Sequence, residues 1–312
     1  MKRGLIDWDT QELPPAELAR RLASVQAVLG TRGLDALVLY SDVWRSNDVR
    51  YLTNYMPYWN RAFAVVPKDG KPILLCSLSP RVYPWIKSVT VHETIIASPN
   101  LPVALFKLCA ERGWAHVGVC DLEGLPADIH AQMLTGKASI VDVPRDEVRQ
   151  GPGEVEVRMH AHAARLARKA LESGLTASDK QSDHELTGRI ERLLRRAGAE
   201  DAVILVSDGR GPPVPASGGM VNKHSSVVVA VEHNGHWAKV TRNLAGVTAP
   251  LPPADGVTGL RETLSGPYSW QSLEGSEATP AVVSLQIEIQ ENDYRLYYGE
   301  TCLQGEEGLR TL

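Results

Sequence analysis

Residues 144–173, PRDEVRQGPGEVEVRMHAHAARLARKALES, mark the point at which the pattern of the chain changes. The first ten residues of this stretch are rich in charge, proline and glycine, which is typical of a turn between domains. The next twenty repeat apolar residues along one stripe, as in an amphipathic helix, and Gly174 follows where a C-terminal cap is expected. We therefore expect one domain to end at residue 146 and a second to begin at residue 147.

Strand and helix patterns alternate upstream of this boundary. Residues 14–29 repeat apolar positions at helical spacing behind a proline, whose missing N–H costs nothing at a helix start. Residues 36–40, ALVLY, form a short apolar run typical of a buried strand. Residues 61–67 and 72–76 flank a KDGK turn and predict a hairpin. The alternation predicts an α/β domain over residues 1–146.

Downstream of the boundary, strand patterns follow a pair of helices. The second helix is predicted at residues 183–196, DHELTGRIERLLRR, with Asp183 as its N-cap. Residues 245–281 are rich in proline and glycine and predict a loop. An α+β domain over residues 147–312 is the expected result. The predicted strands are residues 203–206, 226–232, 238–244, 282–290 and 295–303.

Composition excludes several classes of protein. The 312 residues hold 33 Lys plus Arg against 37 Asp plus Glu, without a basic cluster, so we expect no nucleic-acid partner. No segment approaches the ~20 apolar residues that span a bilayer, and no apolar stretch follows Lys2 and Arg3 as in a secretory signal. The four cysteines are scattered without a CxxC spacing. We therefore expect a cytoplasmic protein with reduced thiols and no membrane partner.

Five short segments carry a resemblance. They are RQGPGEV at residues 149–155, EHNGHWAKVTR at 232–242, SLQIE at 284–288, GET at 299–301 and GEEGLRT at 305–311. In this order they are similar to the motifs R-x-K-S-x-x-E-I, G-Y-x-x-D-x-T-R, I-E-P, R-I-E-D-T and G-x-E-x-L-T of the pita-bread family of aminopeptidase P, prolidase and creatinase. The resemblance covers nearly the whole chain. It implies a creatinase-type N-terminal domain followed by a truncated pita-bread domain.

The metal ligands of that family are only partly matched. Its metallopeptidases hold two divalent ions with two Asp, one His and two Glu. Carried over, the Asp positions fall on Val228 and Lys239, and the Glu positions fall on Glu288 and Glu300. The interval between Arg242 and Glu288, where the His belongs, contains no histidine. Because valine cannot bind a cation and an ammonium repels one, the resemblance implies a chain without metal, and we expect no other cofactor.

Creatinase is the family precedent for hydrolysis of a C–N bond without metal. In its N-terminal domain an aromatic residue and an Arg, spaced F-x-R, reach across a dimer to hold the substrate. The match places Trp59 and Arg61 at these positions. An Arg grips a carboxylate with two parallel hydrogen bonds. The resemblance thus implies a homodimer in which Trp59 and Arg61 bind a carboxylate; alternatively, both residues only decorate a hairpin or pack at the dimer interface.

The catalytic candidates are Lys239, Glu288 and Glu300. We expect Lys239 to pair with both carboxylates, and burial to raise the pKa of Glu288 enough for a general base. The alternative is an inert buried ion pair. Arg242 and His233 are further substrate-binding candidates, although His233 is equally well placed to cap the hairpin that follows it.

Two functions follow from the resemblance. The first is a metal-independent, creatinase-like hydrolase or lyase that cleaves a C–N or related bond in a small carboxylate-bearing amino or guanidino acid, in specialised metabolism. The second is a non-catalytic descendant that binds a peptide or protein partner. A closed cavity lined by Lys239 and Glu288 favours the enzyme, whereas a filled or open cleft favours the binder.

Overall fold

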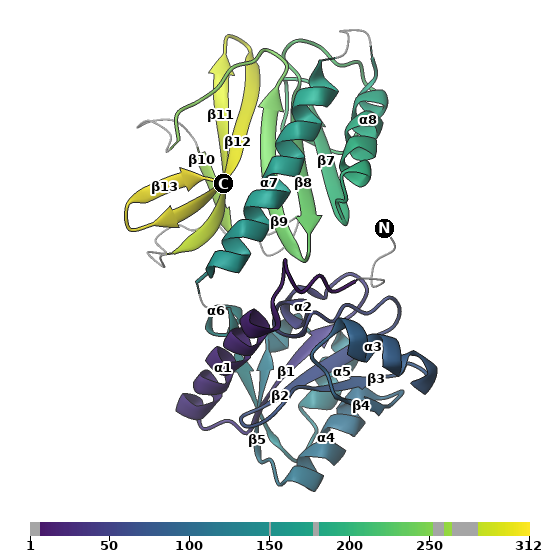
Figure 1. Ribbon diagram of the computed structural model, residues 1–312. Coiled ribbons are helices and arrows are strands. Elements are labelled where there is room, and N and C mark those ends of the chain that lie inside the picture. Colours follow the sequence, from purple (N-terminus) through teal and green to yellow (C-terminus); the bar gives the residue numbers. More distant parts are fainter. Residues whose placement is uncertain (1–6, 150, 177–180, 252–258, 264–279) are drawn as a thin grey trace. The chain divides into compact units, whose positions relative to one another are not determined.

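The computed structural model describes residues 7–149, 151–176, 181–251, 259–263 and 280–312. The chain divides into two compact units, residues 2–150 and 151–312 (Figure 1). Each unit has its own sheet and its own helices, so each is described by itself. No helix within the described ranges is long and apolar enough to span a membrane.

The N-terminal unit contains a six-stranded mixed sheet in the order β4-β3-β2-β1-β5-β6. The hairpin β2–β3 forms around the predicted turn, and β1 pairs with β2 in antiparallel fashion. The pairs β3–β4, β1–β5 and β5–β6 are parallel. The strands are β1 (Ala36–Ser41), β2 (Ala62–Pro67), β3 (Ile73–Cys76), β4 (Thr94–Ala97), β5 (His116–Cys120) and β6 (Ser139–Val143).

Helices cover both faces of this sheet, which is why every residue of β1 and β2 is buried. Leu37 and Leu39 of β1 pack with α1, α2, α3 and α6, whereas Val38 and Tyr40 pack with α4 and α5. This alternation follows from the two-residue repeat of a strand. The helices are α1 (Pro15–Arg32), α2 (Asn47–Thr53), α3 (Tyr83–Val89), α4 (Leu101–Arg112), α5 (Ala127–Met133) and α6 (Arg145–Val148).

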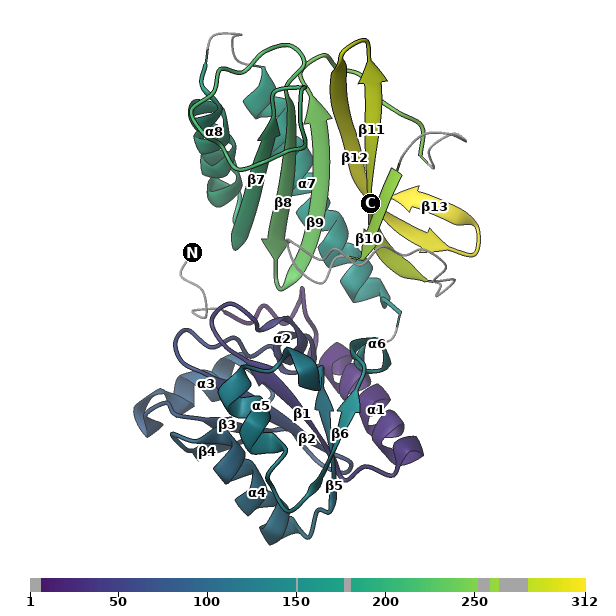
Figure 2. The same cartoon turned by 180° about the vertical axis from the view of Figure 1, so that it is seen from behind.

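The C-terminal unit contains a seven-stranded antiparallel sheet in the order β10-β11-β12-β9-β8-β7, with β13 paired to β12 (Figure 2). The stretch predicted as a loop contains β10, because pairing with the long strand β11 supplies hydrogen bonds that the local pattern does not reveal. The strands are β7 (Asp201–Ser207), β8 (Ser226–His233), β9 (His236–Asn243), β10 (Gly259–Thr263), β11 (Ala281–Glu291), β12 (Tyr294–Gly305) and β13 (Gly308–Thr311).

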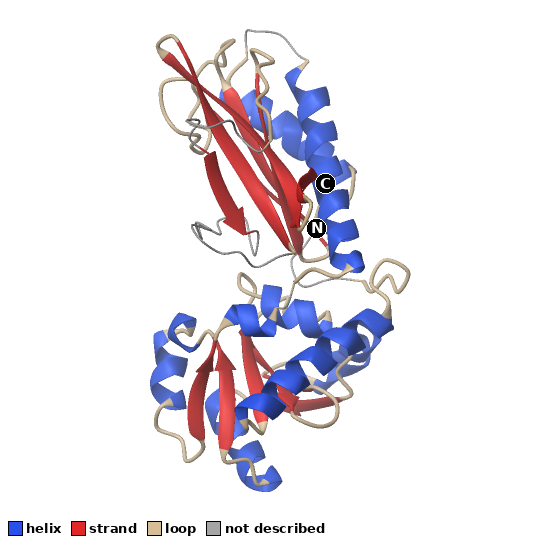
Figure 3. Ribbon diagram, turned by 90° about the vertical axis from the view of Figure 1, so that its left-hand side faces the viewer, coloured by secondary structure: helices blue, strands red, loops and turns tan. Residues whose placement is uncertain are grey.

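Two helices, α7 (Glu154–Leu175) and α8 (Asp183–Arg196), pack on one face of this sheet (Figure 3). We call this face the helix face and the opposite one the far face. Val227, Val229 and Val240 lie in the helix-face core. Because side chains alternate along a strand, Val228, Lys239 and Thr241 project from the far face.

Both predicted helix ends need correction. Gly174 lies inside α7 rather than capping it, because a Cβ there would come within 2.5 Å of Ile190 Cγ1 on α8; the glycine lets the two helices approach closely. The N-cap of α8 is Ser182, whose hydroxyl accepts the N–H of Glu185 while the Glu185 carboxylate accepts the N–H of Ser182. Asp183 instead accepts the N–H groups of residues 217 and 218.

Candidate functional site

Lys239 lies in the middle of β9 with its side chain on the far face, and only 7% of the residue is exposed. Thr301, on the adjacent strand β12, is hydrogen bonded to both backbone groups of Lys239. Its hydroxyl accepts the Lys239 N–H at 2.8 Å and donates to the Lys239 carbonyl at 2.9 Å. These two bonds fix how β9 and β12 meet beside the lysine.

Three neutral polar side chains, Thr241, Gln286 and Ser284, lie beside Lys239 on the far face. We call these four residues the Lys239 row. The Gln286 amide accepts a hydrogen bond from the Thr241 hydroxyl and donates one to Ser284 Oγ at 2.9 Å. Gln286 lies over Gly299 on β12, where any Cβ would come within 2.5 Å of its amide. A larger residue at this position would therefore make the glutamine amide shift and would disturb its two hydrogen bonds.

This row does not fit a pair of divalent ions. The described far-face side chains here come from Val228, Lys239, Thr241, Ser284, Gln286 and Thr301, with neither a carboxylate nor an imidazole among them. Hard divalent cations need several anionic or carbonyl oxygens, and an ammonium opposes them. Within the C-terminal unit, no three described His, Cys, Asp or Glu side chains converge as metal ligands would.

Glu300 lies on the other face of the sheet from Lys239. It pairs with Leu285 in the β11–β12 ladder, and its carboxylate accepts hydrogen bonds from Arg168 Nε on α7, at 2.9 Å, and from Arg242. The predicted pairing of Lys239 with Glu300 is therefore wrong. When the R-I-E-D-T motif is aligned without a gap at Thr301, its Glu falls on Gly299, one residue from Glu300 and on the far face. A one-residue difference is enough to reverse the face of a strand side chain.

Glu288 lies on the far face like Lys239, but it is far from Lys239 along the direction of the strands. It lies four residues beyond Ser284 along β11, which is about 13 Å at strand spacing. Its carboxylate accepts a hydrogen bond from the Tyr297 hydroxyl at 3.2 Å and lies 3.6 Å from Arg295 Nε. Burial, and then the Glu288 charge, raise the pKa of Tyr297. The expected trio of Lys239, Glu288 and Glu300 is thus not assembled.

Arg242 links β9 to β12 and, through Glu300, to helix α7. Besides Glu300, its guanidinium donates to the carbonyls of Thr241 at 2.8 Å and Gly299 at 3.1 Å, and it lies 5.0 Å from the ring centre of Tyr298. All of its contacts among the described residues are structural. Arg242 thus lies on the helix face, opposite to Lys239, and its expected role in binding substrate stays a prediction.

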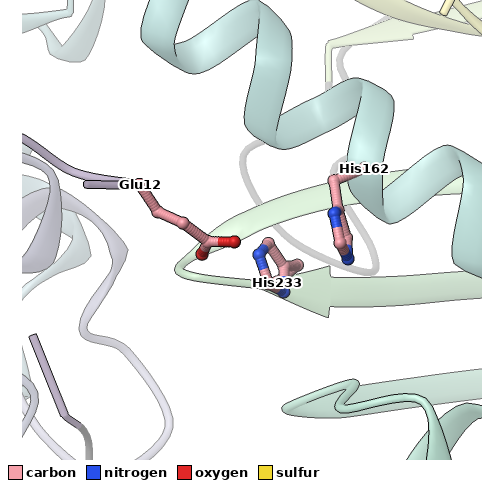
Figure 4. Close-up of side chains that lie close together, drawn as sticks. All are labelled: Glu12, His162 and His233. Carbon is pink, nitrogen blue, oxygen red and sulfur yellow. The ribbon is translucent and has the colours of Figure 1, made fainter. Parts of the chain in front are cut away.

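His233 belongs to a group of four histidines on the helix face. Its ring stacks on that of His162, which comes from α7, with centroids 4.1 Å apart (Figure 4). His160 and His236 meet edge to face at 5.1 Å, and their Nδ1 atoms lie 2.7 Å from the carbonyls of Trp237 and Asn234. This group was not expected from the sequence, although the segments HAH at residues 160–162 and HNGH at residues 233–236 each carry two of its histidines. His233 is thus remote from the Lys239 row.

Arg61 and Trp59 lie in the N-terminal unit, in the segment before β2. Arg61 Nη1 donates to Asp128 Oδ2 at 2.5 Å, and this contact raises the pKa of Arg61 and lowers the pKa of Asp128. Arg61 also lines a small cavity of about 120 Å³ together with Asn100 and Gln132. Trp59 is 61% exposed. Their expected role in binding a carboxylate stays a prediction.

The fold is shared with known peptidases. Residues 21–150 match the family model of the creatinase/prolidase N-terminal domain. The Xaa-Pro dipeptidase from Bacillus anthracis has a TM-score of 0.74 at 14% identity, over 94% of this chain and 97% of that one. The prolidase from Pyrococcus furiosus gives 0.72 at 14% identity over 94% and 98%, and a variant of Escherichia coli aminopeptidase P gives 0.66 at 12% over 98% and 95%.

No curated protein sequence matches the chain. At identities of 12–14% the structural likeness defines the fold, and the family model adds the assignment of the first domain. Residues 21–150 are thus a creatinase/prolidase N-terminal domain, and the chain as a whole has the pita-bread fold of the prolidases and aminopeptidase P.

Proposed function

We propose that this chain is a metal-independent hydrolase or lyase that acts on a small carboxylate-bearing amino or guanidino acid at the Lys239 row. The observation that carries the proposal is the buried ammonium of Lys239 beside the hydrogen-bonded Thr241, Gln286 and Ser284. A buried cation stabilises a carboxylate, or an oxygen on which negative charge develops, because little water screens it.

The proposed chemistry centres on Lys239. In a C–N hydrolysis, water adds to the carbon and the departing nitrogen takes up a proton. Lys239 is the one titratable side chain in the described part of the row, so in this proposal it holds the developing negative charge, supplies that proton and takes up the proton that the added water loses. Glu300 and Arg242 are left out of the catalytic set because they stabilise the helix face, and Glu288 is left out because of its distance along β11.

One observation favours the alternative of a non-catalytic binder. Thr241, Ser284 and Thr301 are fully buried, and Lys239 is nearly so, which leaves a substrate little direct access to the row. In that case the neutral row only stabilises the sheet, and a peptide or protein partner binds elsewhere on the chain.

A ligand screen separates these possibilities. Thermal unfolding is measured with a panel of amino and guanidino acids and, separately, with Mn²⁺ and Zn²⁺. Lys239→Met removes the charge at nearly constant volume, and Lys223→Met makes the same substitution at an exposed lysine of the same unit. We expect an acid from the panel to stabilise the wild type and the Lys223 variant but not the Lys239 variant, and we expect no effect of the metals.

Product formation from the stabilising acid, followed by NMR, then distinguishes an enzyme from a binder. Stoichiometric, tight binding of either metal ion would overturn the metal-independent proposal. A ligand response that survives Lys239→Met would remove the lysine from the site.

A further inference from the structure

A groove of about 480 Å³ lies in the C-terminal unit, between the first turns of α7 and the strands β12 and β13. We call it the α7 groove. Val157 and Ala161 of α7 line one side of it, Leu303 of β12 lines the other, and the lining as a whole is mainly apolar. No member of the Lys239 row is among the described residues that line it. A groove of this size lies within the range of sites for small molecules.

The periods of helix and strand explain why these side chains meet. Val157 and Ala161 are four residues apart and lie on one side of α7, next to the stripe of this helix that packs on the sheet. On β13, Leu309 packs into the apolar cluster under β11 and β12. The next residue, Arg310, projects to the opposite side and lies beside its cross-strand partner Leu303. The α7 groove therefore receives an apolar strip from the helix and a guanidinium group from the strand.

The charged side chains of the α7 groove favour an anion. Arg310 is exposed and forms no ion pair with any residue in the part of the chain that the structure describes. Arg158 of α7 lines the groove as well, and Glu154, one turn earlier, offsets only one of the two arginines. The charged side chains of the lining therefore leave a net positive charge beside an apolar surface. Such a charge attracts an anion, and a guanidinium group can hold a carboxylate with two parallel hydrogen bonds.

We propose that the α7 groove binds a small amphipathic carboxylic acid, such as a medium-chain fatty acid. Its carboxylate contacts Arg310, and its apolar chain packs against Val157, Ala161 and Leu303. Each of these four residues is at least partly exposed, so the acid reaches them without a rearrangement of the fold. The proposal goes beyond the function proposed for the Lys239 row and does not depend on it.

Titration calorimetry with octanoate and three relatives of it tests both contacts. Octanamide keeps the shape of octanoate and removes its charge, octylammonium reverses the charge, and butyrate shortens the apolar chain by half. We expect octanoate to bind about tenfold more tightly than octanamide, as one charge-assisted hydrogen bond allows. Butyrate should bind more than about tenfold more weakly than octanoate, because it buries less apolar surface, and octylammonium should not bind. Equal affinity for octanoate, octanamide and octylammonium, or no saturable binding of octanoate, would overturn the proposal.

Variants assign the contacts to residues. Arg310→Met should abolish the preference for octanoate over octanamide and leave the affinity for octanamide unchanged. Ala161→Trp fills the α7 groove and should prevent the binding of both compounds. Arg310→Met alters only an exposed side chain, so it keeps the test decisive if Ala161→Trp fails to fold.

Matched controls come from the same unit. Arg196→Met changes an exposed arginine on α8, and Lys169→Trp adds the same large ring to an exposed position of α7 outside the groove. Both should leave the affinity for octanoate unchanged. Unchanged affinity in Ala161→Trp, or a loss in Arg196→Met equal to that in Arg310→Met, would contradict the assignment.

The Lys239 variant separates the two proposed sites. Lys239→Met should leave the affinity for octanoate unchanged, and Arg310→Met should leave unchanged any stabilisation by amino or guanidino acids. Loss of octanoate binding in Lys239→Met would place the acid in the Lys239 row and would remove it from the α7 groove.

Discussion

Glu300→Gln provides the sharpest test of whether Glu300 is structural or catalytic. Glu300 is 3% exposed, and its carboxylate forms ion pairs with Arg168 of α7 and Arg242 of β9. The substitution keeps the shape of the side chain but leaves two guanidinium groups facing each other without a counter-charge. Breaking a buried ion pair from one side costs about 3–5 kcal/mol.

The lower end of this range applies here, because the side chains of Arg168 and Arg242 are 23% and 24% exposed and water relieves part of the charge. We therefore expect Glu300→Gln to destabilise the C-terminal unit by about 3 kcal/mol, or roughly 10 °C in its unfolding temperature. Native-state hydrogen exchange of amides in α7 and β12 measures this loss, with amides of the N-terminal unit as an internal reference.

Glu288→Gln is the matched control. Its side chain is 36% exposed and its partner Arg295 is 53% exposed, so its loss should cost less than about 1 kcal/mol. The structural assignment of Glu300 is refuted if the free energy of unfolding of Glu300→Gln lies within about 0.5 kcal/mol of the wild-type value. It is also refuted if Glu288→Gln lowers that free energy more than Glu300→Gln does. Loss of turnover at unchanged stability would restore Glu300 to the catalytic set.

Three further predictions concern other parts of the chain. The pKa of His92 is about 4 in the folded protein and 6.5 in the unfolded chain, so as the pH falls the unfolded chain takes up the proton at a higher pH than the folded one. The free energy of unfolding should therefore fall by up to about 3 kcal/mol between pH 6.5 and pH 4. Urea unfolding at both pH values checks this, and the dependence should weaken in His92→Phe. Burial raises the pKa of Cys120 to about 12 and that of Cys109 to about 11, so iodoacetamide at pH 8 should label neither thiol before unfolding, as followed by mass spectrometry. Gly299→Ala should cost about 1–3 kcal/mol by displacing the Gln286 amide, and a double-mutant cycle with Gln286→Ala should show that most of this cost disappears when the amide is absent.

The sequence alone identified the order of the elements and the most informative substitutions. Apolar periodicity located α1, α7 and α8, and the KDGK turn located the β2–β3 hairpin. These features are local, since a few neighbouring residues decide them. The replacement of two expected metal ligands by Val228 and Lys239 was equally visible, because it is read from the residue types themselves.

Only the tertiary structure decided which side chains meet. The three-residue motif match at residues 299–301 does not determine which residue lies on the same face as Lys239. Because neighbouring strand residues point to opposite faces, Glu300 lies on the helix face and Gly299 lies beneath Gln286. The stacked histidines His162 and His233 likewise come from parts of the chain far apart in sequence. Strand register and helix packing are set by the sum of many contacts across the sheet, which is why a local motif cannot supply them.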